Sequence, residues 1–107
     1  MIQSGDIDGA LRHLEKNAKA GDPTALSDLS YLYFEKKGDL ALGKQWQQRA
    51  LAANDPWALE REGDYFGSGK FGYPEKLEQA VALYRRAATE AMAKLDKIQE
   101  WDEAGID

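Results

Sequence analysis

The sequence predicts a small all-α protein built from repeated pairs of helices. Three observations support this fold class: a segment that recurs at an offset of 33 residues, helix-capping residues in each copy, and a shortage of strand-forming residues. The β-branched residues are Ile2, Ile7, Thr24, Val81, Thr89, Ile98 and Ile106. They are too scattered to form the alternating runs that are typical of a sheet.

The repeat is clearest around two Asp-Pro pairs. Residues 22–26 (Asp-Pro-Thr-Ala-Leu) recur as residues 55–59 (Asp-Pro-Trp-Ala-Leu). Aspartate caps the start of a helix, and proline is well suited to the first helical position because its missing N–H would be unpaired there. Gly21 and Asn54 immediately precede these pairs and favour the left-handed conformation that ends a helix. Each copy is therefore expected to contain a helix, a turn, a cap and the next helix.

These patterns place the helices in order along the chain. We expect helices at residues 8–20, 23–37, 40–53 and 56–66, and a further helix that begins at Pro74. Gly38 should end the second helix, and Asp39 should cap the third. Leu11, Leu14 and Ala18 share one face of the first helix, which we expect to pack against the second.

The third copy of the repeat is altered. A longer loop at residues 67–74 comes first, and the glycine and Asp-Pro pattern is missing after Ala88. Residues 89–101 contain neither glycine nor proline. Apolar residues keep spacings of three and four across this junction, at Leu77, Val81, Tyr84, Ala88, Ala91, Leu95 and Ile98. We therefore predict one long C-terminal helix and five helices in all, with a tight turn near Thr89 and a sixth helix as the alternative.

Composition restricts the chain to one small domain. It has 107 residues, 43% of them apolar and 31% charged, with no cysteine and one histidine. The 19 acidic and 14 basic residues give a net charge of −5, which argues against nucleic-acid or membrane binding because both need clustered Lys and Arg. The sequence has no apolar run that could cross a membrane and begins without an export signal. We expect a cytoplasmic protein.

The repeated pattern resembles the Sel1-like repeat, a relative of the tetratricopeptide repeat. The second copy carries most of this pattern, in Ala58-Leu59, Gly63, Tyr65, Gly67-Ser68-Gly69, Ala80 and residues 83–88 (Leu-Tyr-Arg-Arg-Ala-Ala). The first copy is looser, with Ala25-Leu26, Ser30, Tyr33, Gly38, Gly43, Trp46 and Arg49-Ala50. Ser30 and Gly43 depart from the glycine and alanine that are usual in the family. The matching residues cover about two thirds of the chain.

The resemblance implies a right-handed α–α superhelix of antiparallel helix pairs that acts as a protein-binding scaffold. The whole chain, residues 1–107, would then form a single domain. Its parts would be a helix-one cap at 6–21, repeats at 22–54 and 55–88, and a C-terminal capping helix at 89–103. The polar faces of the terminal helices favour a complete small protein.

The sequence offers little for catalysis. A lone His13 without cysteine argues against zinc sites and nucleophile–base triads. Residues 67–72 match Gly-x-Gly-x-x-Gly, but that dinucleotide-binding motif needs a preceding strand. Residues 6–9 lack the further ligands of a calcium loop, and Asp8 is better placed as a helix cap. We expect no catalytic residue, no metal and no cofactor.

Candidate partner-binding residues follow from the repeat register. One face of the first helix in each repeat carries Trp57 and its equivalents, whereas Leu26, Leu29, Leu59 and Met92 should face the core. The resemblance implies that the Trp57 face lines the concave surface, and Trp, Tyr and Arg are common in binding hot spots. The alternative is partly buried packing or ordinary surface. The candidates on this face are Asp28, Tyr31, Trp57, Arg61, Asp64 and Lys94.

The other aromatic residues divide into two sets. Phe71 and Tyr73 in the long loop form a second candidate patch, because apolar rings on a glycine-rich loop are unfavourable in water. Phe71 and Trp101 are also candidates for self-association, although the sequence specifies no oligomeric state. The aromatic residues expected in the core are Tyr33, Trp46, Tyr65, Phe66 and Tyr84.

The expected function is a non-enzymatic module that binds a partner protein or peptide. A more specific alternative is a small acidic bacterial immunity protein whose negative surface neutralises a basic toxin. The opposing alternative is an enzyme that uses paired carboxylates such as Asp28 and Asp64, although nothing in the sequence supplies a nucleophile, a metal or a phosphate cradle.

Overall fold

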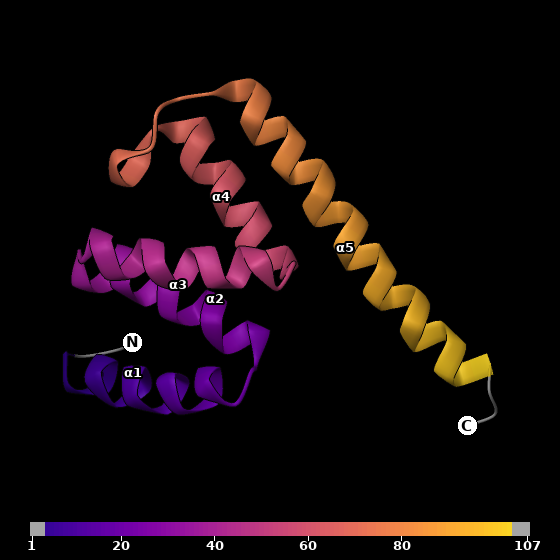
Figure 1. The fold of residues 1–107 in the computed structure, drawn as a ribbon, viewed down its shortest axis with the longest axis horizontal. Coiled ribbons are helices and arrows are strands. Elements are labelled where there is room, and N and C mark those ends of the chain that lie inside the picture. The colour runs from indigo at the N-terminus through magenta and orange to yellow at the C-terminus, as the bar shows by residue number, and fades with distance from the viewer. Residues whose placement is uncertain (1–3, 104–107) are drawn as a thin grey trace. The chain divides into compact units, whose positions relative to one another are not determined.

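The computed structural model describes the backbone of residues 4–103 and the side chains of residues 6–97. In this part of the chain the fold is all-α, with no strand, as predicted (Figure 1). The α-helices are α1 (Ser4–Lys19), α2 (Pro23–Leu32), α3 (Leu40–Ala52), α4 (Pro56–Ser68) and α5 (Leu77–Glu103). A π-helical segment, η1 (Tyr33–Lys37), follows α2, and a 3-10 turn, η2 (Lys70–Gly72), follows α4. The chain forms two compact units, an N-terminal unit up to Ala58 and a C-terminal unit from Leu59.

The two turns before the Asp-Pro pairs have the same backbone structure. Gly21 has a φ of 92° and Asn54 a φ of 56°, both in the left-handed region, as the sequence predicted. Backbone N–H groups donate across each turn in equivalent pairs, from Gly21 to Ala18, from Asn54 to Leu51, from Asp22 to Asn17 and from Asp55 to Ala50. Each of these donors and acceptors is 33 residues from its counterpart, so the repeat in the sequence is also a repeat in the backbone.

Both aspartates cap the helices that follow them. The Asp22 Oδ1 atom accepts a hydrogen bond of 3.0 Å from the Thr24 N–H at the start of α2. The Asp55 Oδ2 atom accepts one of 3.2 Å from the Ala58 N–H at the start of α4. Because these side chains satisfy N–H groups that have no partner inside the helix, the Asp-Pro pairs begin helices, as predicted.

The end of the second predicted helix is wider than expected. The predicted range of 23–37 is confirmed, but its last five residues form the π-helical segment η1. The Asp39 N–H donates to the Tyr33 carbonyl at 2.9 Å, and Gly38 ends the segment with a φ of 67°. The Asp39 side chain then caps α3 by accepting a hydrogen bond from the Leu42 N–H at 3.0 Å. Both punctuating residues thus act as the sequence indicated.

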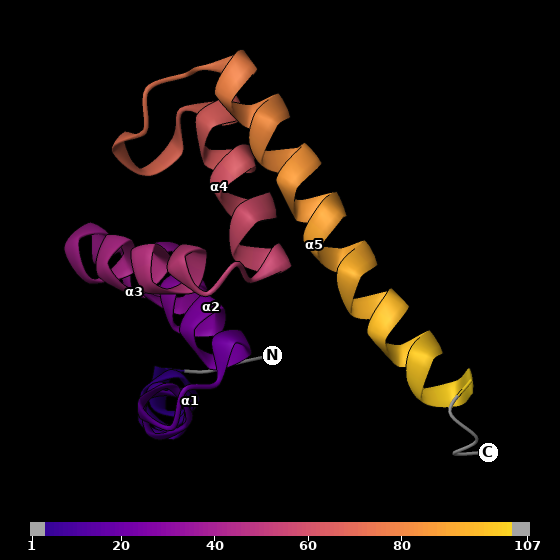
Figure 2. The same cartoon turned by 45° about the vertical axis from the view of Figure 1, so that its right-hand side comes forward.

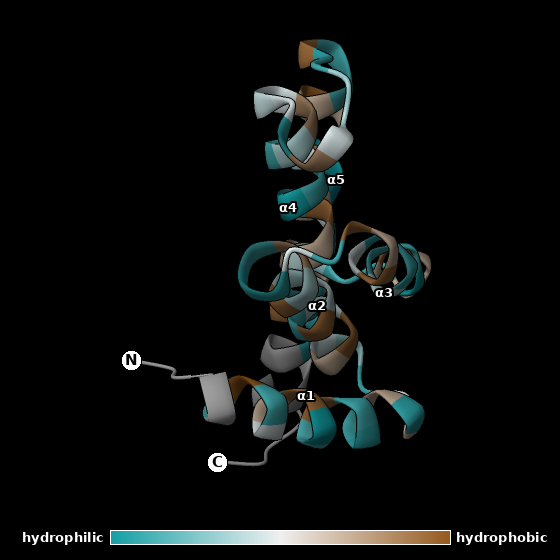
Figure 3. Cartoon of the chain, turned by 90° about the vertical axis from the view of Figure 1, so that its left-hand side faces the viewer, coloured by the Kyte–Doolittle hydropathy of each residue, from teal (hydrophilic) through white to brown (hydrophobic). Residues whose placement is uncertain are grey.

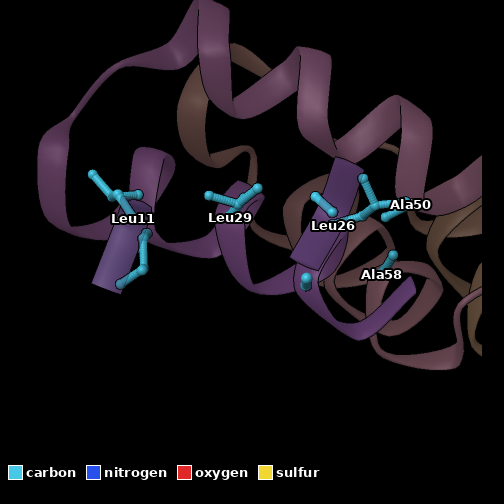
Figure 4. Packing of buried hydrophobic residues seen from close by; sticks show 8 residues of the cluster. Leu11, Leu26, Leu29, Ala50 and Ala58 are labelled. Atoms are coloured by element: carbon cyan, nitrogen blue, oxygen red, sulfur yellow. The ribbon is translucent and has the colours of Figure 1, made fainter. Parts of the chain in front are cut away.

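The core of the N-terminal unit lies among α1, α2 and α3. Leu11 and Ala18 of α1 are buried against α2, as predicted from their shared face, and Leu14 is partly buried beside them. Figure 3 shows that α1 carries both hydrophobic and hydrophilic residues along its length. Figure 4 shows the side chains of the core cluster between the helices, including Leu11, Leu26, Leu29, Ala50 and Ala58.

The α4 and α5 helices form an antiparallel pair in the C-terminal unit (Figure 2). Their buried residues include Leu59, Tyr65, Ala80, Leu83 and Ala87. The α5 helix runs without a break past residue 89, so the prediction of one long C-terminal helix is confirmed. It begins at Leu77, three residues after the predicted start, because the chain is still extended at residue 73.

Three expectations about individual residues are wrong. Met92 is 62% exposed instead of facing the core, and Tyr84 is 40% exposed. Asp8 does not cap α1, because the helix already begins at Ser4. The Asp8 carboxylate instead pairs with the Lys37 ammonium at 2.8 Å, and this hydrogen bond and charge lower the pKa of Asp8.

A glycine allows close approach of an aromatic ring in each helix pair. A Cβ atom on Gly43 of α3 would lie 2.8 Å from the Phe34 ring, and one on Gly63 of α4 would lie 2.8 Å from the Tyr84 ring. Phe34 is only 1% exposed, whereas Tyr84 is 40% exposed. The Phe34 ring is therefore confined on all sides, while the Tyr84 ring has solvent on one side.

We predict that Gly43→Ala destabilises the protein more than Gly63→Ala. The added methyl group at residue 43 overpacks a confined ring, at a cost of about 1–3 kcal/mol in the free energy of unfolding. The same change at residue 63 should cost about 1 kcal/mol or less, because Tyr84 can shift outward and alanine favours the helix. Chemical denaturation followed by circular dichroism measures both values, and equal losses would contradict this explanation.

Candidate protein-binding surface

The predicted binding residues come from both units, and each group has its own environment. Asp28 and Tyr31 lie three residues apart on α2 of the N-terminal unit. Both side chains are half-buried, in contrast to their buried neighbours Leu29 and Ser30. This part of α2 therefore offers a partial surface to a partner.

The strongest candidate group lies along α4. Trp57, Arg61 and Asp64 are spaced by four and three residues, which places them on one face of the helix. Trp57 is 60% exposed, Arg61 is half-buried and Asp64 is exposed. We call these three residues the Trp57 face. Ala58 and Leu59, by contrast, are fully buried, so α4 presents a tryptophan to solvent while it buries smaller apolar residues.

Asp64 also fixes the position of a neighbouring tyrosine. The Tyr84 hydroxyl of α5 donates a hydrogen bond of 2.5 Å to the Asp64 carboxylate. This hydrogen bond raises the pKa of Tyr84 to about 12, because ionisation would place two negative charges side by side. Asp64 thus helps to hold α4 and α5 together. Asp28, its suggested partner in a catalytic pair, belongs to the N-terminal unit.

The second candidate patch, Phe71 and Tyr73, packs within the protein. The Phe71 ring meets the Tyr65 ring edge to face, with centroids 5.2 Å apart. The Tyr73 ring packs against Tyr65 at 5.2 Å and against Phe66 at 5.1 Å. These four rings form an aromatic cluster that closes the loop between α4 and α5, which leaves Phe71 and Tyr73 half-buried.

The Tyr73 hydroxyl strengthens this closure. It donates a hydrogen bond of 2.5 Å to the Glu62 Oε1 atom of α4. Burial and this hydrogen bond both raise the pKa of Tyr73. The Lys76 N–H also donates to the Phe66 carbonyl at 2.8 Å, just before α5 begins. The packing and hydrogen bonds give the loop aromatics a structural role.

The remaining titratable candidates do not form a reactive centre. His13 is exposed on α1, and its Nε2 atom lies 3.3 Å from the Asn17 amide nitrogen. The described residues contain no group of three or more His, Cys, Asp or Glu that could hold a metal ion. Lys94 is exposed on the C-terminal half of α5. Within residues 4–103, no helix is both long and apolar enough to cross a membrane.

Sequence reasoning missed one candidate surface, on α5. Leu77, Val81, Met92 and Leu95 are all exposed on this helix. The spacing of three and four residues was visible in the sequence, but the repeat register assigned Met92 to the core. Two of the residues named from the sequence, Ile98 and Trp101, lie outside the described side chains.

Comparison with known proteins adds no identification. The chain matches no protein-family model, no curated protein and no solved structure. The functional argument therefore depends on the residues and their arrangement.

Proposed function

We propose that this protein is a non-enzymatic interaction module of the Sel1-like repeat type, which binds a partner protein or peptide through the Trp57 face of α4. The observation that carries this proposal is the 60% exposure of Trp57. Leaving a large ring in water is unfavourable, and tryptophan is the residue type most enriched in binding hot spots. Arg61 and Asp64 would add charged groups with which a partner can form directional contacts.

The repeated turns support the family assignment in this proposal. The same hydrogen bonds and the same left-handed residue occur before both Asp-Pro pairs, 33 residues apart. Helical repeats of this length stack through their apolar faces and commonly present surfaces for other proteins. The exposed side of α4 is the corresponding surface in this chain.

The charge of the chain favours a basic partner. Its net charge is −5, and complementary charge speeds association and improves specificity. An immunity protein that neutralises a basic toxin is the most specific form of this proposal. Binding to such a partner should weaken as the salt concentration rises, because salt screens charges on exposed surfaces.

Replacing Trp57 with alanine should weaken partner binding by about 10- to 30-fold, the range of a moderate hot spot. The immobilised protein would first be used to recover partners from a lysate of the source cell. The affinity of each recovered partner for the wild type and the variant would then be measured by calorimetry. Arg61→Ala should also weaken binding, because it removes a charged group from the same face.

Leu40→Ala is the matched control for Trp57→Ala. Leu40 is also an exposed apolar residue near a helix N-terminus, but it belongs to α3. The control should keep wild-type affinity, and both variants should keep the wild-type circular dichroism spectrum. Equal affinity of the wild type and Trp57→Ala for every recovered partner would refute the Trp57 face as the binding site.

A further inference from the structure

The α5 helix carries two separate apolar faces. Ala80, Leu83 and Ala87 form the face that is buried in the C-terminal unit. A second set of residues is exposed to solvent in the structure. Its members are Leu77 (65% exposed), Val81 (48%), Tyr84 (40%) and Leu95 (60%), together with exposed Ala88 and Ala91. We call this second set the α5 seam.

The seam has the spacing of a coiled-coil helix. Its residues follow one another at intervals of 4, 3, 4, 3 and 4 along an unbroken helix. This is the heptad pattern, in which apolar residues recur every 3.5 residues on average and face a second helix. Since α5 has 27 residues and its partner α4 has 13, α4 cannot accompany α5 over its whole length. The seam thus lacks a helix to pair with in the described part of the chain.

We propose that the α5 seam pairs with the α5 seam of a second copy of this chain, in antiparallel orientation. The argument comes from the order of large and small residues. The large residues Leu77, Val81 and Tyr84 occupy the first half of the seam, and the small residues Ala88 and Ala91 occupy the second half, before Leu95.

Reversing one copy brings large residues opposite small ones. When Leu77 of one copy faces Leu95 of the other, Val81 faces Ala91 and Tyr84 faces Ala88 by the same register. The two-fold symmetry repeats each of these pairs, so every seam residue obtains a partner. Interdigitation of large and small residues is what fills the space between packed helices. A parallel pair would instead place Tyr84 on Tyr84 and alanine on alanine.

Two alanines supply a matched pair of variants. Ala91 belongs to the seam, whereas Ala93 lies two residues away on another face of α5, and both are exposed. Ala91→Glu and Ala93→Glu have the same composition and net charge. Ala91→Glu places two carboxylates in the apolar interface of the dimer and should weaken dimerisation by about 100-fold or more. Ala93→Glu should leave dimerisation unchanged.

Sedimentation equilibrium of the full chain tests the pairing. The wild type and Ala93→Glu should reach a mass of twice 11.9 kDa as concentration rises, and Ala91→Glu should remain at the monomer mass. Circular dichroism should be the same for all three, because both substituted positions are exposed. A monomeric wild type at concentrations up to about 1 mM, the limit of weak protein association, would overturn the proposal. Equal dimerisation of the two variants would do the same.

The orientation has its own test, because the chain contains no cysteine. A single spin label on Asp96→Cys reports the distance between the two copies. In the antiparallel register the two labels should be offset by about 30 Å along the helix axis, at a rise of 1.5 Å per residue. In a parallel pair they would lie at the same level. A short distance between the labels would therefore overturn the antiparallel pairing.

Discussion

Replacing Phe34 with alanine is expected to lower the free energy of unfolding by about 3–5 kcal/mol. Phe34 is 1% exposed and is the largest fully buried side chain in the described structure. Its ring lies against the backbone at Gly43, where a Cβ atom would come within 2.8 Å. Helix backbone cannot collapse into the space that the ring leaves, so the cavity should persist. Denaturation in urea, followed by circular dichroism, measures the loss.

The double variant Phe34→Ala/Gly43→Ala tests this explanation. The methyl group at residue 43 overpacks the native site, but it has free space once the ring is removed. The two losses should therefore be strongly non-additive, with the double variant more stable than their sum by at least about 1 kcal/mol. Additive losses would show that the ring and the glycine do not share one packing site. Trp57→Ala is an exposed control and should change stability by less than about 1 kcal/mol.

The features that sequence predicted well depend on neighbours along the chain. The helix starts at the Asp-Pro pairs and the stop at Gly38 follow from the conformational preferences and side-chain hydrogen bonds of a few adjacent residues. These interactions are the same wherever the helices pack. The long α5 helix was predictable for a similar reason, since residues 89–101 contain nothing that would end it.

The orientation of α5 was harder to predict, because spacing alone does not show which apolar face has a partner. The short residues Ala80 and Ala87 lie on the buried face beside α4, while the larger Leu77 and Leu95 are exposed. Close packing of two helices favours small residues at their contact, and Gly63 of α4 is one of them. The repeat register treated Met92 as a core residue because it assumed a further helix beside it.

The candidate site was predicted in part. The register identified Trp57 as distinct from the core residues of α4, and its exposure agrees with that interpretation. It also selected Phe71 and Tyr73, whose rings instead pack against Tyr65. Contacts between a loop and the helices that it joins depend on the path of the loop, which local sequence preferences do not determine.

The two helix pairs solve one packing problem in different ways. By the repeat offsets of 33 and 37 residues, Ser30 and Gln47 in the N-terminal unit correspond to Gly63 and Tyr84 in the C-terminal unit. The Ser30 hydroxyl lies 2.9 Å from the Gln47 Oε1 atom, and the Tyr84 ring lies directly against Gly63. Equivalent positions are thus in contact in both pairs, once through a hydrogen bond and once through close packing. The glutamine in this arrangement is the more demanding choice, because it is 1% exposed.

Replacing Gln47 with leucine should lower the free energy of unfolding by about 2–3 kcal/mol, even though leucine has a similar volume. The Gln47 side chain amide accepts from the Ser30 hydroxyl and donates to the Ala58 carbonyl at 2.9 Å. Leucine removes both hydrogen bonds and leaves polar groups facing an apolar side chain, at a cost of about 1–3 kcal/mol for each group that finds no other partner. The Ser30 hydroxyl retains the Gly43 carbonyl, 3.1 Å away, as an alternative acceptor. The loss at Ser30 should therefore be the smaller one.

A cycle with Ser30→Ala separates the two hydrogen bonds. If Gln47 and Ser30 act as a pair, Ser30→Ala/Gln47→Leu should be more stable than the sum of the two single changes by about 1 kcal/mol, because the second substitution removes a hydroxyl that has already lost a partner. The remaining loss then belongs to the Ala58 carbonyl, at the start of the helix that carries Trp57. A purely additive cycle would mean that Ser30 donates to the Gly43 carbonyl and that Gln47 stabilises the fold through Ala58 alone.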